Sequence, residues 1–186
     1  MFKMIRPLLT GIALLAFTHA LFAHGPSRQK VTKEMIVDAP AAQVWTIIEN
    51  FCAIADWHPA IHSAECDASK GTEIGATRVL TVAEEGGPQI HEELQKFDAE
   101  KMTLKYKISK TDNSVLPVTT YSAFLSVADN GDDTSTVKWR GGFYRAYPNN
   151  NPPENLSDEA AVKAVNAVYD AGLANIKAIA EGSIDK

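Results

Sequence analysis

The sequence predicts an α+β domain in which an antiparallel sheet is covered on one face by helices. Three observations lead to this prediction. An alternating segment at residues 30–37 precedes an amphipathic one at 41–51, five further alternating segments lie between residues 75 and 144, and a long amphipathic segment fills residues 157–181. Runs of strands bounded by helices are typical of this class. Because a sheet that curls around one long helix leaves space between the layers, this order favours a pocket.

The first element is expected to be a strand, and the second a short helix. Residues 30–37, KVTKEMIV, mix apolar and polar residues as a half-buried strand does. Asp38 and Pro40 then give a helix-start signal, with Asp38 near the cap and Pro40 in the first turn. The apolar positions of the following AAQVWTIIENF recur at helical spacing: Val44, Ile47, Ile48 and Phe51.

Five segments then read as antiparallel strands: GATRVLTV, QIHEELQKF, MTLKYKIS, VTTYSAFLSV and TSTVKWRGGFY. Turn residues such as Gly86-Gly87-Pro88 and Asn130-Gly131 separate them. The third segment alternates most cleanly, with one apolar face made by Met102, Leu104, Tyr106 and Ile108. One face of the sheet is therefore expected to be dry.

The last element is expected to be a helix from about Ser157 to Glu181. Ser157 is a plausible N-cap, and Asp158 and Glu159 would lie at the positive end of the helix dipole. About 24 residues would span about 36 Å, enough to cover one sheet. The expected apolar stripe consists of Val162, Val165, Tyr169, Leu173, Ile176 and Ala180.

Residues 1–23 have the pattern of a secretory signal peptide, which leaves residues 24–186 as one domain. Two positive charges precede an apolar stretch, and small residues allow cleavage after Ala20 or after Ala23. An uncleaved anchor is the alternative, but Pro7 and Gly11 interrupt a run shorter than the ~20 residues that a span needs. No later segment is apolar enough to cross a bilayer, so we expect no stable membrane insertion after cleavage.

The chain is acidic and has two cysteines. Its formal net charge is −5, and loss of Lys3 and Arg6 with the signal peptide lowers it to −7, which does not favour binding of nucleic acid or anionic membranes. Cys52 and Cys66 enclose 13 residues, and an exported dithiol tends to form a disulfide. Two buried thiols that never meet are the alternative.

The order and spacing of these segments resemble the START-like (SRPBCC) superfamily, in its polyketide cyclase/dehydrase and lipid-transport branch. The resemblance runs from about residue 30 to 182 and includes APAAQVWTIIENFCAIADWHP and HEELQKFDAEKMTLKYKI as well as the strands above. It implies a helix-grip fold: a curved antiparallel sheet of about seven strands wrapped on the long C-terminal helix, short helices after the first strand, and a cavity between the layers. It implies no universal catalytic motif, so function must be argued from the cavity.

A narrower resemblance is to MxaD-type proteins, which are periplasmic accessory factors of bacterial methanol oxidation. It rests on the signal peptide, the start AHGP, the WHPA turn and the stretch WRGGFYRAYPNNNPPENL. It implies a periplasmic, non-catalytic helper of a quinoprotein methanol dehydrogenase and its c-type cytochrome.

The stretch ADWHPAIHSAEC, residues 55–66, raises the question of a metal site. His58 and His62 are four residues apart, as in helical zinc motifs. However, Pro59 and a strand beginning near Ile61 break that geometry, and on a strand His62 and Glu65 would point to opposite faces. A second hypothesis, copper held by the amine and imidazole of a terminal His24 with another histidine, competes with a frayed terminus. We expect no metal and no cofactor.

Nine residues are candidates for a cavity or its rim. Trp57 and His58 either close the helical segment by packing and capping or contact a ligand there. Arg78 and Glu93 are expected either to form a buried pair that orients a ligand, with His91 beside Glu93, or to be an exposed surface pair. The aromatic candidates are core residues or a cavity wall: Tyr106, Tyr121, Trp139 and Phe143.

The predicted function is therefore that of a binding or accessory protein with a small apolar or aromatic ligand. No nucleophile–base pair, G-x-S-x-G elbow or phosphate loop is recognisable in the sequence. The alternative is a cyclase- or dehydratase-like enzyme, or a carrier of a small aromatic or lipid ligand. Such an enzyme would use His91 or Glu93 as a base in the cavity, with Tyr106 or Arg78 polarising a carbonyl.

Overall fold

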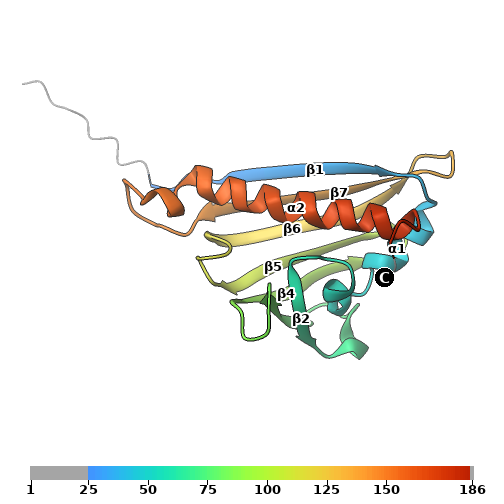
Figure 1. The fold of residues 1–186 in the computed structure, drawn as a ribbon, viewed down its shortest axis with the longest axis horizontal. Coiled ribbons are helices and arrows are strands. Elements are labelled where there is room, and N and C mark those ends of the chain that lie inside the picture. Colours follow the sequence, from blue (N-terminus) through green and yellow to red (C-terminus); the bar gives the residue numbers. More distant parts are fainter. Residues whose placement is uncertain (1–24, 185–186) are drawn as a thin grey trace, which may run out of the picture.

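Seven antiparallel strands form one curved sheet that is wrapped on a long C-terminal helix (Figure 1). The computed structural model describes residues 25–184, so the predicted signal peptide, its cleavage site and His24 lie outside the described residues. The strands are β1 (Gln29–Val37), β2 (Ile61–Cys66), β3 (Thr77–Val82), β4 (Gln89–Asp98), β5 (Thr103–Thr111), β6 (Val118–Asp129) and β7 (Ser135–Arg145). The helices are α1 (Ala41–Ile48), the 3₁₀ turns η1 (Phe51–Asp56), η2 (Ala68–Lys70) and η3 (Glu154–Leu156), and α2 (Asp158–Ala180).

The strand order is β1-β7-β6-β5-β4-β3-β2, so the first strand lies beside the last one. Strands β2 to β7 follow one another as an antiparallel meander, and β1 reaches the far edge by pairing with β7. The predicted α+β helix-grip fold is confirmed. The additional strand that completes the sheet is β2, which begins at Ile61 as the sequence indicated.

The segment after β1 begins differently from the prediction. Helix α1 has Pro40 as its N-cap and no side-chain cap, while the backbone N–H of Asp38 donates to Glu181 Oε1 at 2.8 Å. The helix ends at Ile48, and Phe51 opens the separate turn η1, where the side chain of Asn50 accepts from the N–H of Cys52. Short helices therefore follow the first strand, but Asp38 does not cap them.

Helix α2 is the long helix that the sequence predicted. The Ser157 side chain accepts from the N–H of Ala160 at 3.1 Å, which is the expected N-cap bond. At 23 residues the helix is about 34 Å long. Its buried positions match the predicted stripe with two differences: Ala161 is buried where Val162 is only half-buried, and Gly172 is buried as well. None of the helices in residues 25–184 combines the length and apolar character needed to cross a membrane.

Helix α2 packs mainly on β1 and β7, at one side of the sheet. The Lys33 ammonium in β1 lies 2.9 Å from the Asp170 carboxylate, and Lys177 donates to the carbonyl of Ile36. The strands β3 to β6 curve away from the helix, and η1 with the turn before β2 fills that side (Figure 1). Helix α2 therefore covers the β1–β7 side of the sheet, and the segment around residues 51–61 lies over the part away from it.

Candidate functional site

A cavity of about 70 Å³ lies between the sheet and the helical layer. It has room for a few water-sized groups, well below the space that a drug-sized ligand requires. Most of its wall is apolar, and the polar groups come from one histidine, one glutamate, two tyrosines and one tryptophan. The lining residues are Ile54, His58, Ala60, Ile61, Leu80, Val82, Ile90, Glu92, Tyr106, Ile108, Val115, Leu116, Tyr121, Trp139 and Val168.

A buried ion pair stands at one wall of this cavity. Arg78 Nε and Nη2 lie 2.6 and 2.5 Å from Glu92 Oε2, and the two side chains are 4% and 5% exposed. Arg78 Nη1 also donates to the carbonyl of Phe51, and its guanidinium lies 3.9 Å from the centre of the Phe51 ring. A charged pair this deep is tolerated only because each partner compensates the other.

The prediction that Arg78 pairs with Glu93 is wrong. In the pairing of β3 with β4, Arg78 lies opposite Glu92, whereas Glu93 faces the other side of the sheet and pairs with Lys107 at 2.9 Å. The sequence interpretation assumed that residues alternate strictly between the two faces along this strand. A register shift between residues 94 and 96 breaks that alternation and brings Phe97 onto the inner face, where it stacks on Trp45.

Glu92 has one oxygen without a protein partner. Both Arg78 contacts end on Oε2, and no donor within residues 25–184 reaches Oε1. Complete burial raises the pKa of Glu92 above its ordinary value, and the Arg78 guanidinium opposes that rise. Since Glu92 lines the cavity, Oε1 is an acceptor available to whatever occupies it.

Three tyrosine hydroxyls and one indole form a hydrogen-bonded chain beside it. Trp139 Nε1 donates to the Tyr106 hydroxyl at 3.1 Å, the Tyr106 and Tyr121 oxygens are 3.3 Å apart, and those of Tyr121 and Tyr169 are 2.7 Å apart. Burial raises the pKa of all three tyrosines, so each keeps its proton at neutral pH. Two hydroxyl–hydroxyl contacts use two of three protons. One proton has no acceptor among the described residues, so this cluster can donate to a ligand.

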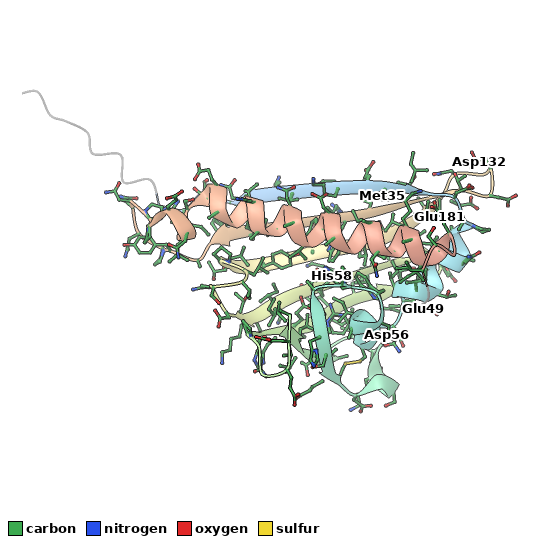
Figure 2. The ribbon with its side chains drawn as sticks, viewed as in Figure 1. Met35, Glu49, Asp56, His58, Asp132 and Glu181 are labelled. Carbon is green, nitrogen blue, oxygen red and sulfur yellow. A yellow bond between two sulfur atoms is a disulfide. The ribbon has the colours of Figure 1, made fainter. Side chains whose placement is uncertain are left out.

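His58 connects the rim of the cavity to helix α2 through a hydrogen bond. Its Nδ1 accepts from the N–H of Ala60 at 3.2 Å, so the ring proton is on Nε2, which donates to the carbonyl of Val168 at 3.1 Å. Burial is the main cause that lowers the pKa of His58, and Arg78 adds to it. Figure 2 shows His58 beneath the middle of α2, where the chain passes from η1 to β2. The ring is therefore neutral and held by two partners.

The other predicted rim residue, Trp57, packs inside the rim without lining the cavity. Its carbonyl accepts from Asn175 of α2 at 2.9 Å, and its ring lies 5.8 Å from that of Trp139 in an edge-on contact. Its indole N–H is buried and has no acceptor within the described part of the chain. The WHP turn is thus attached to α2 at two points, through Asn175 and through Val168.

Of the two alternatives for the cysteines, the structure has the disulfide: Cys52 and Cys66 are bonded, with Cα atoms 5.5 Å apart. The bridge joins η1 to the end of β2, and the chain between the two cysteines carries four cavity-lining residues, Ile54, His58, Ala60 and Ile61. Closing a loop of this length stabilises a fold by about 3 kcal/mol in the loop-entropy description. It also restricts the segment that forms the rim.

The remaining candidates divide between the core and the outer face. Phe143 is fully buried and stacks on Tyr121, away from the cavity wall. His91 lies on the outer face with Glu93, opposite Val79, so neither can act inside the cavity. His62 is exposed while His58 is buried, and residues 25–184 contain no group of three or more His, Cys, Asp or Glu side chains placed to hold a metal ion.

Glu92 is the functional candidate that sequence reasoning missed. A signal was present, because Ile90, Glu92 and Leu94 are spaced two residues apart and the two apolar neighbours define the inner face of β4. Apart from His58, the lining residues from the segment before β2 and from α2 carried no comparable signal. Their position depends on how two distant segments meet.

Comparison with known proteins agrees with this architecture. Residues 28–181 match the family described as polyketide cyclase / dehydrase and lipid transport. The chain belongs to this polyketide cyclase/dehydrase and lipid-transport family. A search of curated proteins found no significant match.

Several solved structures share the helix-grip arrangement of this family. A protein from Nitrosospira multiformis is 27% identical, with a TM-score of 0.67 over 84% of this chain and 100% of its own. The protein XoxI from Bacillus cereus is also 27% identical, with a TM-score of 0.67 over 82% and 95%. The Zhui aromatase/cyclase from Streptomyces sp. R1128 is 19% identical, with a TM-score of 0.63 over 83% and 94%, and shows likeness of fold alone.

Proposed function

We propose that this member of the polyketide cyclase/dehydrase and lipid-transport family is a periplasmic binding protein that assists a quinoprotein methanol dehydrogenase and its c-type cytochrome. Its cavity holds a small, mainly apolar ligand that bears a hydroxyl group. One observation carries the ligand-binding part. Inside a cavity with an apolar wall, Glu92 has an oxygen without a donor, and the tyrosine cluster has a proton without an acceptor.

A hydroxyl group matches both unsatisfied groups, because it donates one hydrogen bond and accepts others. Leaving either group unpaired in an apolar surrounding costs about 1–3 kcal/mol, so a ligand that pairs them gains affinity and selectivity over one that cannot. The cavity volume of about 70 Å³ restricts the ligand to a few non-hydrogen atoms unless the wall opens. Small alcohols fit this volume as it stands, and phenol fits when the wall opens.

The accessory role is supported by sequence features outside the cavity. The signal-peptide pattern, the WHPA turn and the stretch WRGGFYRAYPNNNPPENL resemble the MxaD-type periplasmic factors. The disulfide between Cys52 and Cys66 suits an oxidising compartment such as the periplasm. An acidic chain with a net charge of −5 also suits electrostatic steering toward a basic partner.

The ligand proposal is tested by titrating the protein with phenol and with benzene while recording backbone amide spectra. Phenol should shift resonances around the cavity and bind at least about tenfold more tightly, since only phenol pairs the two polar groups. The variant Ala60→Leu, which fills the rim, should weaken phenol binding. Ala128→Leu, on an exposed position of β6, is the control. Equal binding of both compounds, or an effect of Ala128→Leu equal to that of Ala60→Leu, would contradict the proposal.

The accessory role is tested by methanol-dependent cytochrome reduction with purified dehydrogenase and c-type cytochrome, with and without this protein. We expect a higher rate in its presence, and a smaller increase at high ionic strength because steering is screened. An unchanged rate at both ionic strengths would remove the accessory role while leaving the ligand proposal standing.

The enzyme alternative required a catalytic base inside the cavity. His91 and Glu93 were the expected bases, and both lie on the outer face of the sheet. The carboxylate that does face the cavity, Glu92, is ion-paired with Arg78. No observation on the cavity therefore favours a cyclase or dehydratase over a binding protein.

A further inference from the structure

The outer face of the sheet carries a cationic groove that is separate from the cavity. The groove has a volume of about 210 Å³ and crosses β1, β6 and β7. One lining residue is Phe124, and the centre of its half-buried ring lies 4.3 Å from the Arg140 guanidinium and 5.6 Å from the Lys105 ammonium. Lys30 of the edge strand β1 and Arg28, which directly precedes that strand, line the same groove.

These four cations lack carboxylate partners. No carboxylate of residues 25–184 lies within 4.0 Å of Arg28, Lys30, Lys105 or Arg140. Two acidic residues of the outer face are already paired with lysines. Glu34 pairs with Lys138 at 2.6 Å, and Glu93 pairs with Lys107 at 2.9 Å. A concentrated positive patch is therefore built on a chain whose net charge is −5.

The local backbone accommodates one of these cations. A Cβ at Gly142 would lie 2.6 Å from Nη2 of Arg28, so the absence of a side chain there lets the guanidinium lie directly over β7. The Arg140 guanidinium lies over the Phe124 ring. Both arginines are thus supported by contacts that leave the edges of the guanidinium group available, and these edges are the part that binds carboxylates in a bidentate manner.

We propose that this outer-face groove, defined by Arg28, Lys30, Lys105, Phe124 and Arg140, is a docking surface for an acidic segment of a partner protein. A half-buried aromatic ring beside an arginine combines two residue types that are enriched at protein interfaces. The groove is shallow and its cations are solvated, so a small free anion would remain in water there and gain little. A covering protein segment removes that water.

The size of the patch favours a protein segment over other polyanions. A nucleic-acid duplex or an anionic bilayer extends beyond four cations and would meet the acidic remainder of the surface, which repels it. A short segment rich in Asp and Glu fits within the patch. This docking surface is independent of the cavity ligand, since its residues lie on the opposite face of the sheet.

The test is fluorescence anisotropy of a labelled hexaglutamate peptide mixed with the protein at low ionic strength and at about 0.15 M salt. We expect binding at low salt that weakens as salt rises. The double variant Lys105→Glu/Arg140→Glu should lower the affinity at least about tenfold, and Phe124→Ala should lower it by a smaller factor. The milder Lys105→Gln/Arg140→Gln pair gives the same readout if charge reversal disturbs folding, which a thermal melt detects.

The matched control is Lys101→Glu/Lys163→Glu, which changes the net charge equally at two exposed positions outside the groove. It should leave peptide affinity within about twofold, because only local charge pairs contribute. No hexaglutamate binding, or an equal loss in the control, overturns the proposal. Tighter binding of single-stranded DNA or anionic vesicles that depends on the same cations overturns it in favour of another class of partner.

Discussion

Glu92 and Glu93 are neighbours in β4, yet the two faces of the sheet place them in opposite physical surroundings. Glu92 is enclosed with Arg78 under the helical layer, where neither charge meets bulk water. Glu93 pairs with Lys107 on the outer face, with both side chains more than a third exposed. The comparison shows that a glutamate on the inner face cannot lose its basic partner without a large cost, whereas the corresponding pair on the outer face is a minor surface contact.

The two glycines of β7 show the same difference between the inner and the outer face of the sheet. A Cβ at Gly141 would lie 2.2 Å from the Tyr169 hydroxyl in the buried cluster, whereas a Cβ at Gly142 would meet only the flexible end of Arg28. The inner position, Gly141, is therefore constrained by a buried side chain that has no room to move. The outer position, Gly142, faces a side chain that can swing into water.

Breaking the inner ion pair should have the largest effect. Arg78→Met leaves Glu92 buried without its partner and should lower the free energy of unfolding by about 3–5 kcal/mol. Lys107→Met, the matched change on the outer face, should cost under about 1 kcal/mol. Urea unfolding followed by tryptophan fluorescence measures both values.

A second variant shows whether the loss comes from the unpaired charge. Arg78→Met combined with Glu92→Leu removes both charges, and replacing a whole buried pair by apolar residues is often neutral. The double variant should therefore recover much of the stability lost in Arg78→Met. If Arg78→Met and Lys107→Met cost the same, the contrast between the faces is wrong.

The neighbouring glycines should give an intermediate effect. Gly141→Ala forces the new methyl group against Tyr169 and should destabilise the protein by about 1–3 kcal/mol, as overpacking in a core does. Gly142→Ala displaces only the Arg28 side chain, and its change should lie within about 0.5 kcal/mol of zero. Thermal or urea unfolding of the two variants checks the difference. An equal loss in both would show that the outer position is as constrained as the inner one.

The order of elements and the disulfide could be predicted because they depend on local patterns. Alternation at residues 102–109, the Ser157 cap and the apolar stripe of the last helix each lie within one segment. Strict alternation along the whole of β4 does not predict the face of Glu93 correctly. The irregularity between residues 94 and 96 puts Phe97 on the opposite face from the one that alternation from Glu93 would give it. Reading from Ile90 and Leu94 alone places Glu92 inside.

The cavity itself depends on contacts between distant segments. His58 lines it because its ring reaches the carbonyl of Val168, and Gly172 leaves space for that ring beside Trp139. Nothing in the local sequence around residue 58 specifies where α2 will lie. The amount of space left between the layers is a small difference between large packed volumes, so neither its size nor its shape follows from residue patterns.

The smallest expected effect is the pH dependence that His58 brings to the inner face. Burial lowers its pKa below the ordinary value of 6.5, so the unfolded chain binds a proton at a higher pH than the folded one. Stability contributed by the neutral ring is complete above pH 6.5 and is lost as the pH falls below that value. Protonation would also put a proton on Nδ1 of His58. That N–H would face the backbone N–H of Ala60, from which Nδ1 accepts a hydrogen bond in the neutral ring.

Glu92 affects the pH dependence of stability with the opposite sign. Burial raises its pKa, so above pH 4.5 the folded state binds a proton more readily than the unfolded chain does. Comparison with His58→Gln isolates the histidine, since that variant keeps Glu92 and Arg78. Between pH 7 and pH 5, the wild type should lose more unfolding free energy than His58→Gln, and the exposed-site control His62→Gln should follow the wild type. Parallel curves for wild type and His58→Gln would mean that the buried ring does not couple folding to proton binding.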